Sequence, residues 1–180
     1  MALVPYIELP DMPASVQAHM QRVPPLNIFK ALANSDAVAS GLIDLGGALI
    51  SAGTLGKQLK ELIVLRVGFN SSANYEVFQH RQVARVLDIA PEKVEALQGS
   101  LEAAVFSPLE RDVLRLADAL LGNVKAPAEL LAPVADALSP GQLIEVITVV
   151  GLYMLMCRLL DTLEIDIEDD ELITTWFSAS

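Results

Sequence analysis

Three side chains suited to proton transfer lie between positions 61 and 80 of the chain. Glu76 and His80 are four residues apart, so on a helix they share one face and their side chains can meet. Glu61 stands at the end of an apolar run, where packing does not call for a carboxylate. A carboxylate near a histidine orients the imidazole and raises its proton affinity. The sequence therefore predicts that His80 exchanges protons near neutral pH, with Glu61 and Glu76 as its partners.

Two other interpretations of these residues stay open. His80 can be a core residue and Glu61 a surface glutamate. The three side chains can also bind a metal, although carboxylate metal sites in helical bundles use a glutamate and a histidine three residues apart rather than four. Only three ligands are visible, so we expect no metal, and we expect no cofactor.

The elements that must position these residues are helices. Apolar residues recur at helical spacing through most of the chain after residue 14, without an alternating strand pattern or a glycine-rich phosphate loop. Two helix starts are sharply marked, because Ser107 and Ser139 are each followed by a proline and then by Glu110 or Gln142, which makes a capping box. The expected helices span residues 38–50, 59–69, 73–87, 92–98, 109–121 and 143–163.

These patterns predict an all-α protein with one domain. The helix at 73–87 is expected to be capped by Ser71 or Ser72. Residues 1–13, which contain three prolines, are expected to form an extended N-terminal arm. Residues 14–180 are expected to form a single helical bundle, since this length supports one ordinary core.

Composition limits the classes of partner. The formal net charge is −11 and no cluster of Lys and Arg is present, so we expect neither nucleic acid nor a membrane surface as a partner. The most apolar run, 143–160, is interrupted by Glu145 and Arg158. Its uncharged part is shorter than the ~20 residues that cross a bilayer, so it is expected to be a central core helix.

The high apolar content favours association between copies of the chain. Hydrophobic residues make up 53% of the sequence and the mean hydropathy is +0.45, which is more than one small core hides comfortably. We therefore expect a homo-oligomer. The N-terminus lacks the basic and apolar regions of a signal peptide, and one cysteine, Cys157, fits a reducing compartment. We expect a cytoplasmic protein.

The order of these residues resembles the carboxymuconolactone decarboxylase family and its alkyl hydroperoxidase D relatives. Glu61 comes first, followed after a spacer by Asn74-Tyr75-Glu76 and then by His80. Two later segments also resemble the longer family members, and the resemblance covers roughly residues 38–165. It implies a helical bundle of the alkyl hydroperoxidase D type that assembles as a dimer, trimer or hexamer.

The peroxidase branch of the family uses a glutamate, a Cys-x-x-Cys pair and a histidine. By resemblance, the glutamate falls on Glu61, the histidine on His80, and the two cysteines on Ala73 and Glu76. Peroxide reduction of this type needs a thiolate and a resolving thiol. Both are absent at these positions, and Cys157 lies in an apolar run where its thiolate is disfavoured. The resemblance therefore does not imply thiol peroxidase activity.

The decarboxylase branch needs no cysteine. Loss of CO₂ from a carboxylated lactone leaves a dienolate that must be protonated on carbon, and His80 is the candidate acid. A cation can hold the departing carboxylate, and Arg66 and Arg158 are the candidates, with Tyr75 as a further substrate-binding residue. Glu76 does not suit a decarboxylase site, because its carboxylate repels an anionic substrate.

The leading hypothesis is a decarboxylase-like enzyme that transfers protons on a small, carboxylated organic substrate. The alternative is a helical protein that keeps the fold without the catalysis, as a ligand-binding or oligomeric structural protein. Arg81 and Arg85 are further nearby cations, with surface ion pairs as their simpler role.

Overall fold

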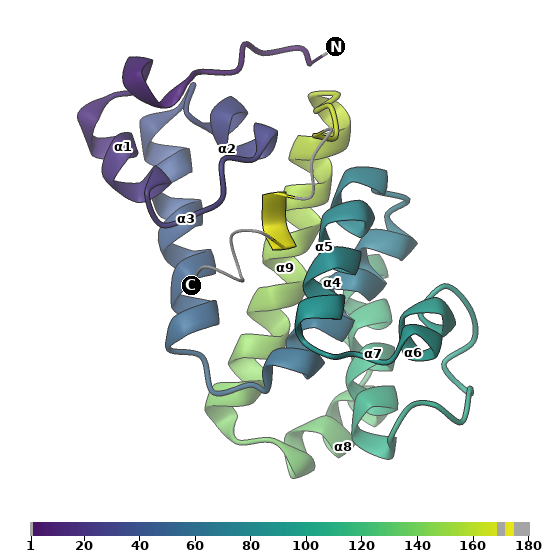
Figure 1. The fold of residues 1–180 in the computed structure, drawn as a ribbon. Helices are drawn as coiled ribbons and strands as arrows, with labels where there is room; N and C mark the ends of the chain where they lie inside the picture. Colours follow the sequence, from purple (N-terminus) through teal and green to yellow (C-terminus); the bar gives the residue numbers. More distant parts are fainter. Residues whose placement is uncertain (1, 169–171, 175–180) are drawn as a thin grey trace.

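The structure is a computed structural model that describes residues 2–168 and 172–174. The end of the predicted bundle, and part of the acidic segment 164–171, lie outside the described residues. The described residues are all-helical (Figure 1), as the sequence predicts. The helices are η1 (Leu9–Asp11), α1 (Ala14–Met20), α2 (Asn27–Leu32), α3 (Asp36–Ser51), α4 (Lys57–Asn70), α5 (Asn74–Val86), α6 (Pro91–Ala96), α7 (Pro108–Gly122), α8 (Ala128–Ala137) and α9 (Pro140–Thr162).

Helix α4 is the centre of the bundle. It packs against α5, α7 and α9, and every residue from Lys60 to Gly68 is buried. A helix that is covered on all sides has no amphipathic pattern, and the apolar residues of α4 accordingly face several directions around its axis. The polar residues inside this buried stretch are therefore held by specific partners rather than by solvent.

The two predicted capping boxes are confirmed. Ser107 accepts a hydrogen bond from the backbone N–H of Glu110, and Ser139 does the same for Gln142. The predicted cap of α5 is wrong: Ala73 is the N-cap, and no side chain caps this helix. Ser72 instead adopts a left-handed backbone conformation with φ 55° and turns the chain sharply between α4 and α5.

This sharp turn brings α5 back against α4 at Gly68. A Cβ atom at position 68 would lie 3.2 Å from Cγ2 of Val77 and 3.7 Å from Cβ of Glu76. The 3.2 Å contact is tighter than side chains normally accept, so glycine permits this close approach of the two helices. The face of α5 that carries Glu76 is thereby pressed against α4.

The N-terminal arm lies across its own chain. The backbone N–H of Leu3 donates to the carbonyl of Leu163, and Ile7 donates to Lys30 in α2. The hydroxyl of Tyr6 also donates to the carboxylate of Asp166, at 3.1 Å. Helices α1 to α3 stand together beside the main bundle, with the arm along their outer edge (Figure 1).

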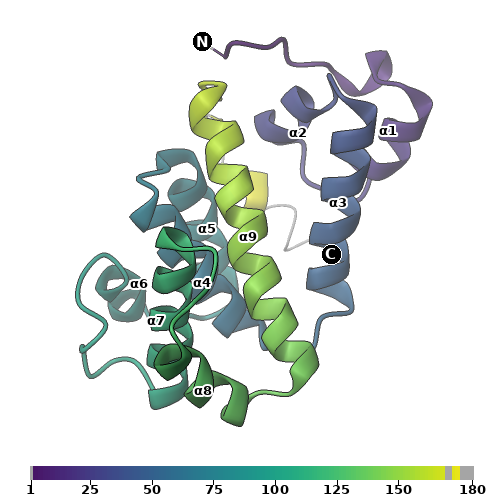
Figure 2. The same ribbon diagram turned by 180° about the vertical axis from the view of Figure 1, so that it is seen from behind.

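Helix α9 is long and apolar enough to pass a composition test for a membrane span. It packs against α4, α7 and α5, so it is a helix of the bundle, as predicted. Only 33% of its most apolar stretch is buried within one chain. Ile144, Ile147 and Leu155 are 65%, 44% and 42% exposed on one side of it. In Figure 2, α9 runs along the front of the molecule and no other helix lies in front of it.

Candidate active site

Glu61, Glu76 and His80 meet between α4 and α5. The imidazole Nδ1 of His80 lies 2.7 Å from Oε1 of Glu61, and Nε2 lies 3.0 Å from Oε1 of Glu76. The side chains are 7%, 6% and 14% exposed for Glu61, Glu76 and His80, respectively. The structure thus brings together all three residues that the sequence singled out for proton transfer.

The environment favours the protonated form of His80. Burial on its own lowers the pKa of an imidazole, but the charges of Glu61 and Glu76 and their hydrogen bonds outweigh it and raise the pKa to about 10. Near neutral pH the ring is therefore an imidazolium that donates one hydrogen bond to each glutamate. Both ring nitrogens are occupied, so neither is left to contact a substrate.

Tyr153 of α9 covers the imidazole from a third direction. Its ring meets that of His80 edge-on, with the ring centroids 5.1 Å apart and the planes at 86°. Burial, together with the charges of Glu76 and Glu61, raises the pKa of Tyr153 well above its ordinary value. The phenol therefore stays protonated. Sequence reasoning missed this residue, because a tyrosine within an apolar helix carries no signal beyond packing.

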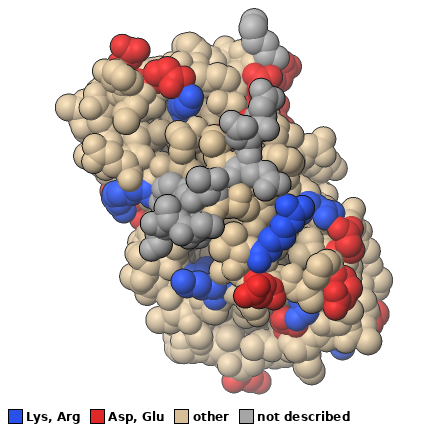
Figure 3. Space-filling view, in the orientation of Figure 1, with Lys and Arg blue, Asp and Glu red and all other residues tan. Residues whose placement is uncertain are grey.

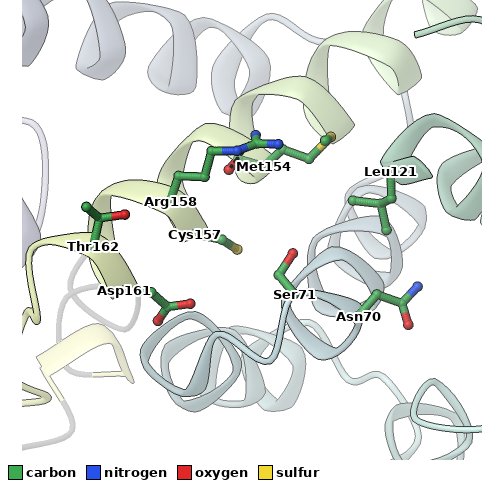
Figure 4. A pocket seen from close by; sticks show the side chains of 8 residues that line it. All are labelled: Asn70, Ser71, Leu121, Met154, Cys157, Arg158, Asp161 and Thr162. Carbon is green, nitrogen blue, oxygen red and sulfur yellow. Dashed lines mark hydrogen bonds between the residues drawn. The ribbon is translucent and has the colours of Figure 1, made fainter. Parts of the chain in front are cut away.

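A cavity of about 310 Å³ lies between the end of α4 and the last turns of α9 (Figure 4). Glu76 is not among the lining residues, but its charge contributes to raising the pKa of two of them, Cys157 and Asp161. The lining residues are Asn70, Ser71, Leu121, Met154, Cys157, Arg158, Asp161 and Thr162. The cavity is thus within electrostatic range of Glu76 and large enough for a small molecule.

Cys157 is not a reactive thiol in this setting. Its side chain is buried and points toward Ser71 across the cavity (Figure 4). Burial and the charge of Glu76 outweigh a hydrogen bond with Ser71 and raise the pKa of Cys157 to about 12. A thiol with this pKa is almost wholly protonated at neutral pH, so it is a poor nucleophile.

Arg66, which the sequence suggested as a substrate-binding cation, is engaged by the protein itself. Its Nε and Nη2 donate to the two carboxylate oxygens of Asp118 at 2.8 and 2.7 Å. Its Nη1 donates to the backbone carbonyls of Leu97 and Gly99. The guanidinium therefore ties α4 to α7 and to the end of α6, and we no longer assign it to substrate.

Tyr75 also lies away from the cavity lining. Its hydroxyl donates to Glu168 at 2.6 Å, and Gln79 and the backbone N–H of Asn27 donate to the same carboxylate. Burial and the charge of Glu168 raise the pKa of Tyr75 well above its ordinary value. This cluster fastens the segment after α9 onto α5 and α2, a structural role in place of the predicted contact with substrate.

Arg158 is the predicted substrate-binding residue that does line the cavity. It is exposed, and its Nη1 donates to the carbonyl of Met154 at 3.2 Å. Arg81, in contrast, pairs with Glu95 and lies over the ring of Phe69. Among the candidate cations, Arg158 therefore has the best placement for a ligand.

The geometry gives no support to the metal interpretation. Within residues 2–168 and 172–174, no group of three or more His, Cys, Asp and Glu side chains is arranged to hold a metal ion. The imidazole nitrogens of His80 face the two glutamates, and no coordination position is shared by the three side chains. The arrangement fits an ion-paired acid–base group instead.

The charged side chains on one face of the molecule are mixed in sign. On the face drawn in Figure 3, Lys and Arg lie in small groups, several of them beside Asp or Glu. Several of the basic groups are paired, for example Lys30 with Glu8 and Arg22 with Asp44.

Comparison with known proteins supports the predicted family. Residues 36–119 match the model of the Carboxymuconolactone decarboxylase family. This segment contains Glu61, Glu76 and His80. No curated protein matches the sequence.

Solved structures share the fold across nearly the whole chain. A peroxidase-related protein from Ralstonia eutropha JMP134 with the alkylhydroperoxidase AhpD core has a TM-score of 0.82 and 18% identity, covering 96% of this chain and 95% of that one. A peroxidase-related protein from Silicibacter sp. TM1040 has a TM-score of 0.78 and 17% identity, covering 94% and 92%. A variant of the debrominase Bmp8 in complex with 2,3,4-tribromopyrrole has a TM-score of 0.76 and 19% identity, covering 98% and 97%. At these identities the likeness establishes an AhpD-like helical fold.

Proposed function

We infer that this chain, which is a Carboxymuconolactone decarboxylase family protein over residues 36–119, is an acid–base enzyme acting on a small, carboxylated organic substrate. The imidazolium of His80 holds the proton that is transferred, and Glu61 orients the ring. Glu76 passes the proton to a substrate in the cavity beside α9. The observation that carries this proposal is the pair of contacts from Nδ1 and Nε2 of His80 to Glu61 and Glu76.

In this proposal Glu76 carries a proton and does not bind the carboxylate of the substrate. Because both imidazole nitrogens are engaged, His80 does not protonate the substrate directly. Glu76 accepts the proton from Nε2 and delivers it, and the proton lost from His80 is replaced from solvent in each cycle. By resemblance, Glu76 stands where the peroxidase branch has a cysteine, so a carboxylate takes the place of a thiol at the substrate end of the relay.

The proton affinity of His80 indicates the kind of acceptor it serves. An acid with a pKa of about 10 holds its proton too tightly for a weakly basic oxygen. It gives up that proton readily to a strongly basic carbanion or enolate, such as the one that loss of CO₂ leaves behind. The site is therefore better suited to protonation or deprotonation at carbon than to hydrolysis.

A proton-exchange assay tests this function without knowledge of the physiological substrate. The protein is incubated in D₂O with a set of small β-keto and lactone carboxylates, and deuterium incorporation at carbon and CO₂ release are followed by NMR. Turnover by the wild-type protein that is lost in both His80→Gln and Glu76→Gln supports the proposal. Turnover that is the same in all three proteins contradicts it.

A structural role for the same residues is the second candidate. An imidazolium held between two buried carboxylates also joins α4 to α5, and removing one member of a buried ion pair costs stability. If His80→Gln unfolds the protein, while any activity per folded molecule is unchanged, the group is structural and its catalytic role is refuted.

A further inference from the structure

Two opposite charges line the cavity without neutralising each other. Arg158 and Asp161 are three residues apart on α9, a spacing at which such residues commonly pair. Instead, the guanidinium turns back along the helix to the carbonyl of Met154. In Figure 4 the two side chains leave α9 in different directions around the cavity. Within the described ranges, neither forms an ion pair.

The side of the cavity near Asp161 is negative. Asp161 and Glu76 lie close enough that burial of Asp161 and the charge of Glu76 together raise the pKa of Asp161. The imidazolium of His80 balances one of its two glutamates, so this group keeps a net charge of −1. With Arg158 and Asp161 included, the cavity and its neighbourhood carry an excess of one negative charge. A carboxylate ligand that also carries a positive charge is therefore favoured over a simple anion, and a dianion is disfavoured most.

Both features are satisfied by one class of ligand. We propose that the cavity binds a small zwitterion of the amino-acid type, with its carboxylate held by Arg158 and its protonated amine held by Asp161. The proposal rests on the proposed function, because it names the substrate class of the same site. A volume of about 310 Å³ is near the lower end for ligand pockets, so the molecule is small. Its apolar part packs against Leu121 and Met154.

Matched probes separate the two charges. Leucine and γ-aminobutyrate carry both charges at different spacings, isocaproate is leucine without its amine, and isoamylamine is leucine without its carboxylate. Binding is followed through isotope-labelled methionine methyl groups, because Met154 lines the cavity and the chain has five methionines. A Met154→Leu variant identifies the reporting signal. At least one zwitterion is expected to shift this signal and to bind at least ~10-fold more tightly than isocaproate and isoamylamine.

Two substitutions test the assignment of each charge. Arg158→Gln is expected to weaken binding of the zwitterion ~10-fold and leave isoamylamine unaffected. Asp161→Asn is expected to weaken the zwitterion by a similar factor and leave isocaproate unaffected. Arg115→Gln is the matched control, since Arg115 pairs with Glu102 on the surface and does not line the cavity.

Each contrary outcome overturns the proposal. Isocaproate binding as tightly as the zwitterions means a simple anion site, and isoamylamine binding as tightly means a simple cation site. No shift of the Met154 signal with either zwitterion means that the cavity does not take this class. His80→Gln is expected to bind the zwitterion while losing proton exchange, so a failure of the ligand assignment is distinguishable from a failure of the acid–base function.

Discussion

The ring of Tyr153 on α9 stands edge-on to the imidazole of His80 on α5, with the ring centroids 5.1 Å apart and the planes at 86°. Aromatic rings favour this arrangement, because the positive edge of one ring meets the negative face of the other. Tyr153 thereby covers a side of the imidazole that Glu61 and Glu76 leave open. The ring of His80 is held from three directions, by two carboxylates and one aromatic ring.

The first prediction concerns the protonation of His80. The chain has two histidines, so its imidazole NMR signals are few and His19→Gln assigns them. The pKa of His80 is raised to about 10, so its signal is expected to stay that of an imidazolium from neutral pH to about pH 9. Glu76→Gln and Glu61→Gln are each expected to lower this pKa. A His80 signal that titrates near its ordinary pKa of 6.5 contradicts the ion-paired site.

The free energy of unfolding is expected to depend on pH through the protonation of His80. The pKa of His80 is 6.5 in the unfolded chain and about 10 in the folded one, so the folded state binds the proton more tightly. The stabilisation is therefore fully present below pH 6.5 and is lost as pH rises toward 10. Urea unfolding across this range should show a steeper loss for the wild-type protein than for His80→Gln. Equal slopes would show that the imidazolium adds nothing to stability.

The third prediction distinguishes the role of His80 on α5 from that of Glu61 on α4. Once a substrate is found, His80→Gln is expected to lower activity by ~10²-fold or more, the usual size of a lost general acid or base. Glu61→Gln is expected to lower it less, because the proton carrier remains. Circular dichroism checks that α5 is retained, since glutamine is a good helix former. A larger loss for Glu61→Gln than for His80→Gln would reverse the two assignments.

The fourth prediction concerns peroxides. Cys157 has a pKa of about 12 and no second thiol to resolve an oxidised intermediate. No thiol-dependent reduction of organic hydroperoxides is expected, and Cys157→Ser should leave any background rate unchanged. A coupled assay that shows clear turnover in the wild-type protein, and none in Cys157→Ser, would establish the peroxidase chemistry that we exclude.

The fifth prediction concerns association of the chain. The exposed side of α9 presents Ile144, Ile147 and Leu155, and we expect a second copy to cover it. Ile147→Glu is expected to shift the protein to monomer in analytical ultracentrifugation. Val124→Glu is the control, because Val124 is fully exposed outside α9. A wild-type protein that sediments as a monomer at micromolar concentration would remove this expectation.

The sequence predicted the helices better than it predicted their contacts. The 59–69 pattern became α4 and the 143–163 pattern became α9, within a few residues at each end. Helix α8 received no prediction of its own, since it is short and carries Pro133 inside it. Local spacing is enough to find a helix, because helical periodicity and capping act over a few residues.

The site was predictable only where local spacing defines it. Glu76 and His80 share a face of one helix, so their contact follows from the sequence. The contact of Glu61 with His80 depends on how α4 packs against α5. The ion pair of Arg66 with Asp118 likewise depends on how α4 packs against α7. No local pattern encodes such pairings between helices.

The absence of a side chain at Gly68 has a consequence for how this site can change. The distance between α4 and α5 is set where Val77 approaches Gly68, and the same two helices carry Glu61 and His80. Even a methyl group at position 68 would press on Val77 and push the two helices apart. A substitution at Gly68 would therefore change the packing of the core and the geometry of the proton relay together.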